Sequence, residues 1–362
     1  MESYDVVIVG AGIAGTGLAY NLKQICPEIK VLVIEQYGVG SHAGYGYRNT
    51  YGNVIEGYNL PYVKKFKGLI LQAKNHLKEE SIKLEIKLDV PFYLVNYKEI
   101  CKSLFERSGV KYSNDTCIKT LGKNKVLTKK GIYLFKFLVD CSGSNFFIRR
   151  EKRLKMPYCY WVCKKIEKFP TVESGDYFTY IVTSDGGLKE QYPLGEEMIV
   201  AEWKFESCIN PHHKKIPGLV IPCNPSTPMV MGNIAFLGDS FGNATTSAGE
   251  GIRPILETSK LLAKCIKEEN LQKYPKLWNK IFLKTYLKHL ATRLNQKDKI
   301  KQLEMLKEDP RSILKILRCE HVDKETIKKF PKTTLLINGL NYAALLAKHK
   351  LYEKSEFLKF QN

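Results

Sequence analysis

The sequence of 362 residues predicts an α/β protein that combines a parallel sheet, an antiparallel sheet and a C-terminal helical region. Three observations support this prediction. Short β-branched runs alternate with helical segments in the first 150 residues, as in parallel α/β folds. Residues 151–229 are rich in aromatic and β-branched residues and contain turn signals, which is typical of antiparallel strands. From Ser259 onward the apolar residues follow a helical spacing.

Residues 4–35 contain the elements of a dinucleotide-binding unit. Residues 4–9 form an apolar run typical of a buried parallel strand, and the glycine-rich sequence GAGIAG follows at residues 10–15. Residues 16–25 have helical character, and a second apolar strand over residues 31–34 ends in Glu35. A lone GxGxxG pattern is a weak signal, but strand, helix, second strand and terminal acid together predict a Rossmann-type unit.

Each residue of this unit has a physical role. Gly10 permits the tight turn, Gly12 lets a pyrophosphate approach the backbone, and Gly15 lets the helix pack closely on the strand. The helix N-terminus offers free N–H groups and a partial positive charge to the phosphates. Glu35 lies at the spacing of an acid that binds a ribose hydroxyl, which disfavours NADP. The predicted dinucleotide contacts are Gly10, Gly12, Ile13, Ala14, Gly15 and Glu35.

Two later segments favour FAD over NAD. Strands over residues 133–139 and 234–237 end near glycines, and the second is followed by Asp239, at the sheet edge where ligands bind. There Asp239 would accept a hydrogen bond from the ribityl chain, although alone it is as consistent with a helix cap. A helix from Ile252 would present its positive N-terminus to the flavin's pyrimidine edge and stabilise the reduced anion. The further predicted contacts are Gly143, Gly238, Asp239, Gly249, Gly251 and Ile252.

The predicted domains are interleaved along the chain. Residues 1–60, 96–150 and 230–265 would form the FAD-binding domain, and residues 61–95 and 151–229 an antiparallel-sheet substrate domain. Residues 266–362 would form the C-terminal helical region. Within it, residues 280–294 have one apolar face and a row of lysines, so this helix either packs on its own protein or lies on a membrane surface.

Composition narrows the class of protein. No apolar run reaches the roughly 18–20 residues that cross a bilayer, since residues 335–347 are interrupted by polar residues and a glycine. We expect no signal peptide, because no basic segment precedes an apolar stretch at the N-terminus. The ten cysteines are scattered without a CxxC pair, which predicts a reducing cytoplasm and no metal site.

The formal net charge of +20 indicates a basic surface. Such a surface attracts anionic lipid heads, nucleic acid or a phosphorylated substrate, but a solvated lysine-rich surface explains it equally well. No nucleic-acid-binding motif accompanies the charge, so we expect no nucleic-acid partner.

The sequence resembles the geranylgeranyl reductase family of FAD-dependent flavoproteins, which includes digeranylgeranylglycerophospholipid reductases. The wider superfamily also contains aromatic hydroxylases and halogenases. The resemblance is strongest over residues 221–252, where GDSFG at 238–242 and GEGI at 249–252 are similar to the family's flavin-binding segments. The sequence YPLG at 192–195 is similar to the family's aromatic-Pro-Leu-Gly motif, and residues 95–110 to its helix before the third strand.

The sequence also departs from the family. Asn96 and Tyr97 stand where the family has an Asp-Arg pair, which leaves Lys98 as a replacement for the arginine. The loop after the second strand reads SHAG at 41–44 and lacks the family's cysteine. The hydroxylase branch fits less well, because its His and paired prolines after Gly-Asp are missing here and the next proline is Pro254.

The resemblance implies an FAD-dependent reductase that saturates C=C bonds of geranylgeranyl chains, most simply those of archaeal-type ether lipids. Candidate proton donors, by location or resemblance, are Tyr192, His42 and Glu250. Because there is no second dinucleotide fingerprint, electrons would come from a ferredoxin-like protein or from transient NAD(P)H. The alternatives are an FAD-dependent monooxygenase of the same superfamily and a non-catalytic flavin- or lipid-binding protein. The protein would be cytoplasmic, with peripheral membrane contact as an option.

Overall fold

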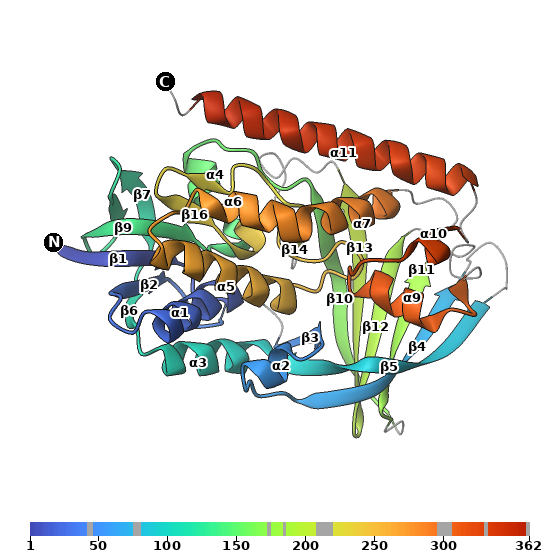
Figure 1. The fold of residues 1–362 in the computed structure, drawn as a ribbon. Coiled ribbons are helices and arrows are strands. Elements are labelled where there is room, and N and C mark those ends of the chain that lie inside the picture. The colour runs from blue at the N-terminus through green and yellow to red at the C-terminus, as the bar shows by residue number, and fades with distance from the viewer. Residues whose placement is uncertain are drawn as a thin grey trace.

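The computed structural model describes residues 1–41, 46–74, 81–171, 175–183, 186–207, 220–294, 306–328 and 332–359. Within these residues the strands form two sheets of eight strands each. Figure 1 shows the first sheet near the N-terminus, the second sheet at the opposite end, and helices packed along both. The fold is therefore the predicted α/β arrangement with a second sheet and a helical C-terminal region.

The first sheet has a parallel centre in the order β16-β9-β1-β2-β6, with β15 antiparallel at one edge and the β7–β8 hairpin beside β9. Its strands are β1 (Glu2–Val9), β2 (Val31–Glu35), β6 (Lys111–Asn114), β7 (Cys117–Leu121), β8 (Lys125–Thr128), β9 (Ile132–Asp140), β15 (Val230–Met231) and β16 (Ile234–Phe236). The central strands are buried on both faces, which explains their unbroken apolar sequences.

Helices α1 (Ile13–Ile25), α3 (Tyr97–Ser108) and α5 (Ile252–Lys267) pack beside one another, with α1 in the middle. The close approach of α1 to α5 depends on Gly17, because a Cβ there would lie 2.5 Å from Leu256 Cδ2. Asn21 Nδ2 donates to Ser259 Oγ at 2.7 Å and so joins the same two helices. The N-terminal unit and the segment after residue 250 thus form one layer.

The second sheet has the order β14-β10-β13-β12-β11-β4-β5-β3 and is antiparallel except between β11 and β4. Its strands are β3 (Tyr47–Tyr51), β4 (Lys64–Lys74), β5 (Ser81–Asn96), β10 (Cys159–Pro170), β11 (Tyr177–Thr183), β12 (Gly187–Leu194), β13 (Glu197–Ser207) and β14 (Val220–Pro222). β3 lies within residues 1–60 of the predicted FAD-binding domain but pairs with β5 in this second sheet.

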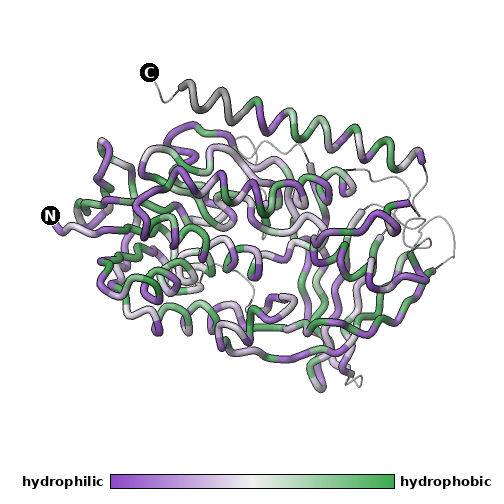
Figure 2. Tube along the Cα trace, viewed as in Figure 1, coloured by the Kyte–Doolittle hydropathy of each residue, from purple (hydrophilic) through white to green (hydrophobic). Residues whose placement is uncertain are grey.

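Aromatic residues fill the core of the second sheet. Phe92 stacks on Phe178 at 3.9 Å between ring centroids, and Phe66 and Tyr192 pack around them. Figure 2 shows hydrophobic residues gathered along the strands. These rings form a continuous packed cluster, so they are structural rather than a lining for a ligand.

The remaining helices follow α5 or connect the strands. They are α2 (Val54–Gly57), α4 (Phe147–Glu151), α6 (Lys273–Trp278), α7 (Lys284–Leu294), α9 (Pro310–Leu317), α10 (Lys324–Lys328) and α11 (Lys332–Lys359), with short turns η1 (Gly143–Asn145), η2 (Gly238–Ser240) and the π-helical η3 (Asn279–Leu283). In the predicted amphipathic helix, the buried Tyr286, Leu287 and Leu290 face the protein's own core. No helix within the described ranges is long and apolar enough to cross a bilayer.

Candidate active site

A cavity of about 630 Å³ lies where the parallel strands of the first sheet end. It is lined by residues that follow β1, β2, β9 and β16, and on its other side by β3, β12 and β13 of the second sheet. The carboxyl edge of a parallel sheet is the usual ligand position in such folds. Of the twelve predicted cofactor contacts, ten line this cavity, and the other two, Gly15 and Gly238, do not.

The glycine-rich turn after β1 is shaped by contacts that exclude side chains. Gly10 has a φ of +107°, and a Cβ there would lie 2.3 Å from Cys141 O. A Cβ on Gly15 would lie 1.9 Å from Gly10 O. Gly12 differs, because its φ of −77° is ordinary and the close neighbour of its Cβ is the Tyr97 hydroxyl at 2.9 Å. The turn therefore leaves backbone open to the cavity, which fits a diphosphate.

Glu35 holds this turn in place. Its Oε2 accepts a hydrogen bond from Ala11 N at 3.0 Å, and its Oε1 accepts one from Tyr37 N at 2.9 Å. The carboxylate also lines the cavity and is only half-buried. It therefore combines a structural role with a position at which a ribose hydroxyl would reach it.

Tyr97 is a cavity residue that sequence reasoning missed. Its hydroxyl accepts a hydrogen bond from Ile13 N, in the first turn of α1, at 3.0 Å. Asn96 caps α3 by accepting from Lys98 N and Glu99 N, which sets the orientation of the first helical turn. The Lys98 side chain is exposed and does not line the cavity, so Tyr97 and not Lys98 occupies the place beside the glycine turn.

Asp239 lines the cavity after β16, and none of the hydrogen bonds among the described residues involves its carboxylate. Burial raises its pKa to about 7, and the positive charge of Arg48 opposes this shift. The carboxylate does not cap its own short helix. It is consequently available to a polar ligand group in the cavity.

The glycine-rich turn before α5 forms another wall. Gly249 has a φ of +68°, and a Cβ there would lie 3.1 Å from the Trp161 ring. Gly251 and Ile252 line the cavity at the N-terminus of α5, where backbone N–H groups lack helical partners. This end therefore offers a partial positive charge to the cavity.

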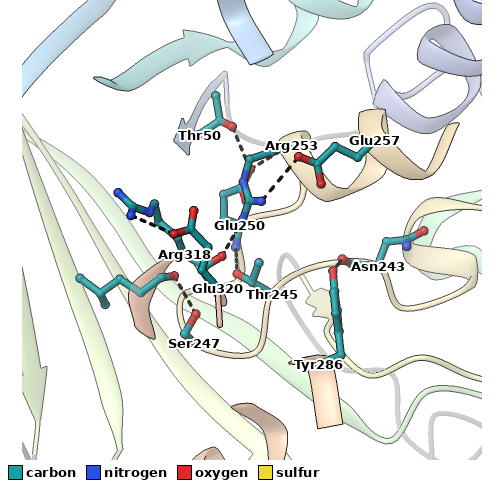
Figure 3. Close-up of polar contacts among 11 residues, drawn as sticks. Thr50, Asn243, Thr245, Ser247, Glu250, Arg253, Glu257, Tyr286, Arg318 and Glu320 are labelled. Atoms are coloured by element: carbon teal, nitrogen blue, oxygen red, sulfur yellow. Dashed lines mark hydrogen bonds and ion pairs between the residues drawn. The ribbon is translucent and has the colours of Figure 1, made fainter. Parts of the chain in front are cut away.

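Glu250 lies in this turn, but its carboxylate is used for anchoring. Oε1 accepts hydrogen bonds from Thr50 Oγ1 and from Arg253 N, both at 2.8 Å. Oε2 lies 3.7 Å from Arg253 Nε. Figure 3 shows Arg253 between Glu250 and Glu257 and near the chain at Arg318. Glu250 therefore lines the cavity and at the same time ties the turn to β3 and, through Arg253, to the C-terminal region.

The Glu250→Ala variant is expected to lose about 3 kcal/mol of unfolding free energy, because it removes the buried carboxylate that faces the Arg253 guanidinium. Urea denaturation measures this change. Glu257→Ala is the matched control, since it removes a carboxylate that is 43% exposed from the same guanidinium and should cost under about 1 kcal/mol. Equal losses in the two variants would contradict the anchoring role.

The other two predicted proton donors do not lie in the described cavity wall. Tyr192 is absent from the lining, because its ring is packed among Phe66, Phe92 and Phe178. Its hydroxyl accepts a hydrogen bond from Asn49 Nδ2 at 2.6 Å. His42 lies outside the described residues. Tyr192 thus positions Asn49, and Asn49 lies between Tyr192 and the cavity.

A polar group from the second sheet faces the cavity instead. It consists of Arg48 and Asn49 on β3, Glu190 on β12 and Trp203 on β13. Glu190 is 4% exposed, and its Oε2 accepts a hydrogen bond from Trp203 Nε1 at 3.0 Å. Asn49 Nδ2 lies 3.4 Å from Glu190 Oε1.

Burial raises the pKa of Glu190 to about 7, although hydrogen bonds from Tyr192 and Trp203 oppose the shift. Burial also lowers the pKa of Arg48, whose charge remains positive near Asp239 and Glu190. A buried carboxyl with a pKa near neutrality at a cavity wall is a typical general acid. The sequence indicates that Glu190 is a buried acid, because Leu188, Glu190 and Tyr192 alternate along one strand and therefore share a face.

Comparisons with known proteins agree with this architecture. Residues 5–96 match a family described as FAD dependent oxidoreductase. No curated protein matches the chain. Among solved structures, the flavin-dependent brominase Bmp2 has a TM-score of 0.68 and 15% identity, with 96% of this chain and 99% of that chain covered.

Two further structures have the same fold. A geranylgeranyl bacteriochlorophyll reductase-like protein from Thermoplasma acidophilum has a TM-score of 0.68 and 19% identity, covering 94% of this chain and all of the other. PqsL, a probable FAD-dependent monooxygenase from Pseudomonas aeruginosa, has a TM-score of 0.58 and 16% identity. The match covers 87% of this chain and 99% of PqsL. The names of these neighbours refer to different reactions, so the likeness establishes the fold and not the reaction.

The cavity fits FAD on structural grounds. Gly12 leaves backbone open for the diphosphate, Glu35 and Asp239 place carboxylates along the cavity, and the N-terminus of α5 closes it. The cavity extends from this edge to β3, β12 and β13 of the second sheet. The chain has the fold of the FAD-dependent oxidoreductases, and FAD is its cofactor.

Proposed function

We propose that this oxidoreductase saturates C=C bonds of geranylgeranyl or other polyprenyl chains, with archaeal-type ether lipids as the first substrate class to test. The observation that carries the proposal is Glu190, a buried carboxyl group held at the cavity wall by Trp203 and Asn49. The reduction of an alkene requires both a hydride and a proton, and the wall of the cavity offers an acid for the proton.

Bound FAD in its reduced form supplies the hydride. An isolated alkene is a poor hydride acceptor, so protonation of one carbon must accompany hydride addition to the other. The Glu190 O–H would donate this proton and leave a carboxylate, which regains a proton from solvent after product release. Because its pKa is about 7, a large fraction of the group is protonated at neutral pH.

The neighbouring wall suits a hydrocarbon chain. Val220, Ile221 and Ala248 line the cavity, and the Trp203 ring of the polar group adds apolar surface. Apolar walls with a few convergent polar groups exclude water and hold an apolar substrate in one orientation. The sequence resemblance to geranylgeranyl reductases and the fold shared with the Thermoplasma protein add support for a prenyl substrate.

The electron donor in this proposal is a ferredoxin-like protein or transiently bound NAD(P)H. An acidic ferredoxin-like partner would be attracted by the net charge of +20. Both donors can be tested with the same purified protein.

An anaerobic single-turnover experiment tests the reaction. The bound flavin is photoreduced, a geranylgeranyl ether lipid is added, and we expect the flavin to reoxidise while the lipid gains two hydrogens per reduced bond. Mass spectrometry reads the product. Absence of reoxidation with every prenyl substrate would contradict the proposal, as would turnover that requires oxygen.

A further inference from the structure

Helix α11 (Lys332–Lys359) has an outer face with several exposed leucines. It is 28 residues long and, at about 1.5 Å per residue, spans roughly 42 Å. Figure 1 shows it along the outside of the molecule, over α7. Figure 2 shows hydrophobic residues recurring along it. One side of this helix packs on the protein, and the other faces solvent.

The inner side of α11 is accounted for by the protein itself. Thr334, Leu345 and His349 are buried, and Asn341 Nδ2 donates to Ala291 O on α7 at 3.3 Å. Lys348 Nζ lies 4.0 Å from the centre of the Tyr158 ring. These contacts fix the rotation of the helix about its axis, and therefore which residues point outward.

The outer side carries a stripe of apolar residues. The spacing of four, three, four and four residues places them on one side of the helix. Leu336, Leu340 and Leu351 are 64%, 63% and 68% exposed. We call this set the outer stripe: Leu336, Leu340, Ala343, Ala347 and Leu351.

The exposed charges that the structure describes on α11 have one sign. Among the described exposed residues of α11, Lys332 and Lys350 are the charged ones, and none is acidic. A helix face that only meets water normally carries charges of both signs and few leucines. Apolar residues flanked by lysines instead characterise helices that lie in the interface of a membrane.

We propose that the outer stripe of α11 docks the protein on an anionic lipid surface. The leucines would enter the boundary between headgroups and acyl chains, and Lys332 and Lys350 would contact lipid phosphates. A second copy of the chain is a poorer occupant, because a net charge of +20 on each molecule opposes self-association. Docking needs no membrane-spanning helix, and it does not depend on the reaction proposed above.

Vesicle co-sedimentation of the full chain with bound FAD tests the proposal. We expect binding to vesicles of phosphatidylcholine with phosphatidylglycerol, and at least about tenfold weaker binding to phosphatidylcholine alone. Raising the salt concentration should weaken the lysine contribution. Equal binding to both vesicle types, or none to either, overturns the proposal.

A pair of matched variants locates the docking face. Leu336→Glu/Leu340→Glu should weaken binding to the anionic vesicles at least about tenfold, because both side chains are exposed and would enter the interface. Val63→Glu/Phe169→Glu adds the same charge at apolar side chains that are 43% and 45% exposed elsewhere, and should bind within about threefold of wild type. If both variants lost vesicle binding equally, the change in net charge would explain the loss, and the assignment of the docking face to α11 would be overturned.

A fluorescence measurement gives an independent readout. Tryptophan in Leu340→Trp should shift to shorter wavelength on anionic vesicles and be quenched by brominated lipid chains, above the background of the three native tryptophans. Sedimentation velocity completes the test. A dimer that the Leu336→Glu/Leu340→Glu variant dissociates, without vesicle binding by wild type, would assign the stripe to a second copy and overturn the proposal.

Discussion

The Gly12→Val variant is expected to bind FAD at least about 100-fold more weakly than wild type while keeping its fold. Gly12 has a φ of −77°, which any residue adopts, so the backbone there does not require glycine. The requirement is for space, because a side chain at this position projects toward the cavity and the Tyr97 hydroxyl. Losing two charge-assisted hydrogen bonds to the diphosphate costs about 3 kcal/mol, which corresponds to about 100-fold.

Titration of the apoprotein with FAD, followed by flavin fluorescence, measures this loss. The matched control is Gly57→Val, because a Cβ at Gly57 meets no atom within 4 Å and the residue lies outside the cavity lining. Far-UV circular dichroism should give the same spectrum for both variants. An unchanged FAD affinity in Gly12→Val would exclude the glycine turn as the diphosphate site.

The parallel sheet could be predicted because its signals are local. β1 and β2 are short runs rich in β-branched residues, and their ends are marked by Gly10 and Glu35 at the ligand edge. The second sheet was harder, since its pairing is long-range. β3 joins β5 through residues that lie more than 40 positions apart, and no local pattern predicts which sheet receives it.

The cofactor side of the cavity was predictable for the same reason, whereas the opposite wall was not. Glycines and acids near strand ends have few alternative explanations. Glu190 required knowledge of which face of β12 meets the cavity, which depends on how the two sheets pack. Its position between Leu188 and Tyr192 indicates a buried acid, but not what it faces.

For two predicted proton donors, the resemblance placed the segment but not the partners of the side chain. Glu250 lies in the expected turn, yet Thr50 and Arg253 bind its carboxylate. Tyr192 lies on the expected strand, yet its ring fills the aromatic core. A motif fixes the path of the backbone, while the partners of each side chain come from segments far away in the sequence.

The Glu190→Gln variant is expected to reduce the alkene at least about 100-fold more slowly than wild type, because a positioned general acid contributes about 10²–10⁴ in rate. Glutamine preserves the shape of the side chain and can still accept from Trp203 Nε1, so the cavity should remain intact. FAD affinity should stay within about threefold of wild type, which separates this effect from loss of the cofactor. Asn49→Ala should give a smaller loss, since it removes only a positioning contact.

The pH dependence distinguishes an acid from a structural residue. Because the folded pKa of Glu190 is about 7, the rate of alkene reduction should fall as pH rises through 7, and the variant should lose this dependence. The same raised pKa means that Glu190 contributes stability below its unfolded value of 4.5, and that this contribution is lost as pH rises toward 7. Trp203 fluorescence offers a probe without turnover, since its N–H bonds to this carboxyl. A titration near pH 7 that persists in Glu190→Gln would belong to another group, such as Asp239, and would remove Glu190 from the proton-donor role.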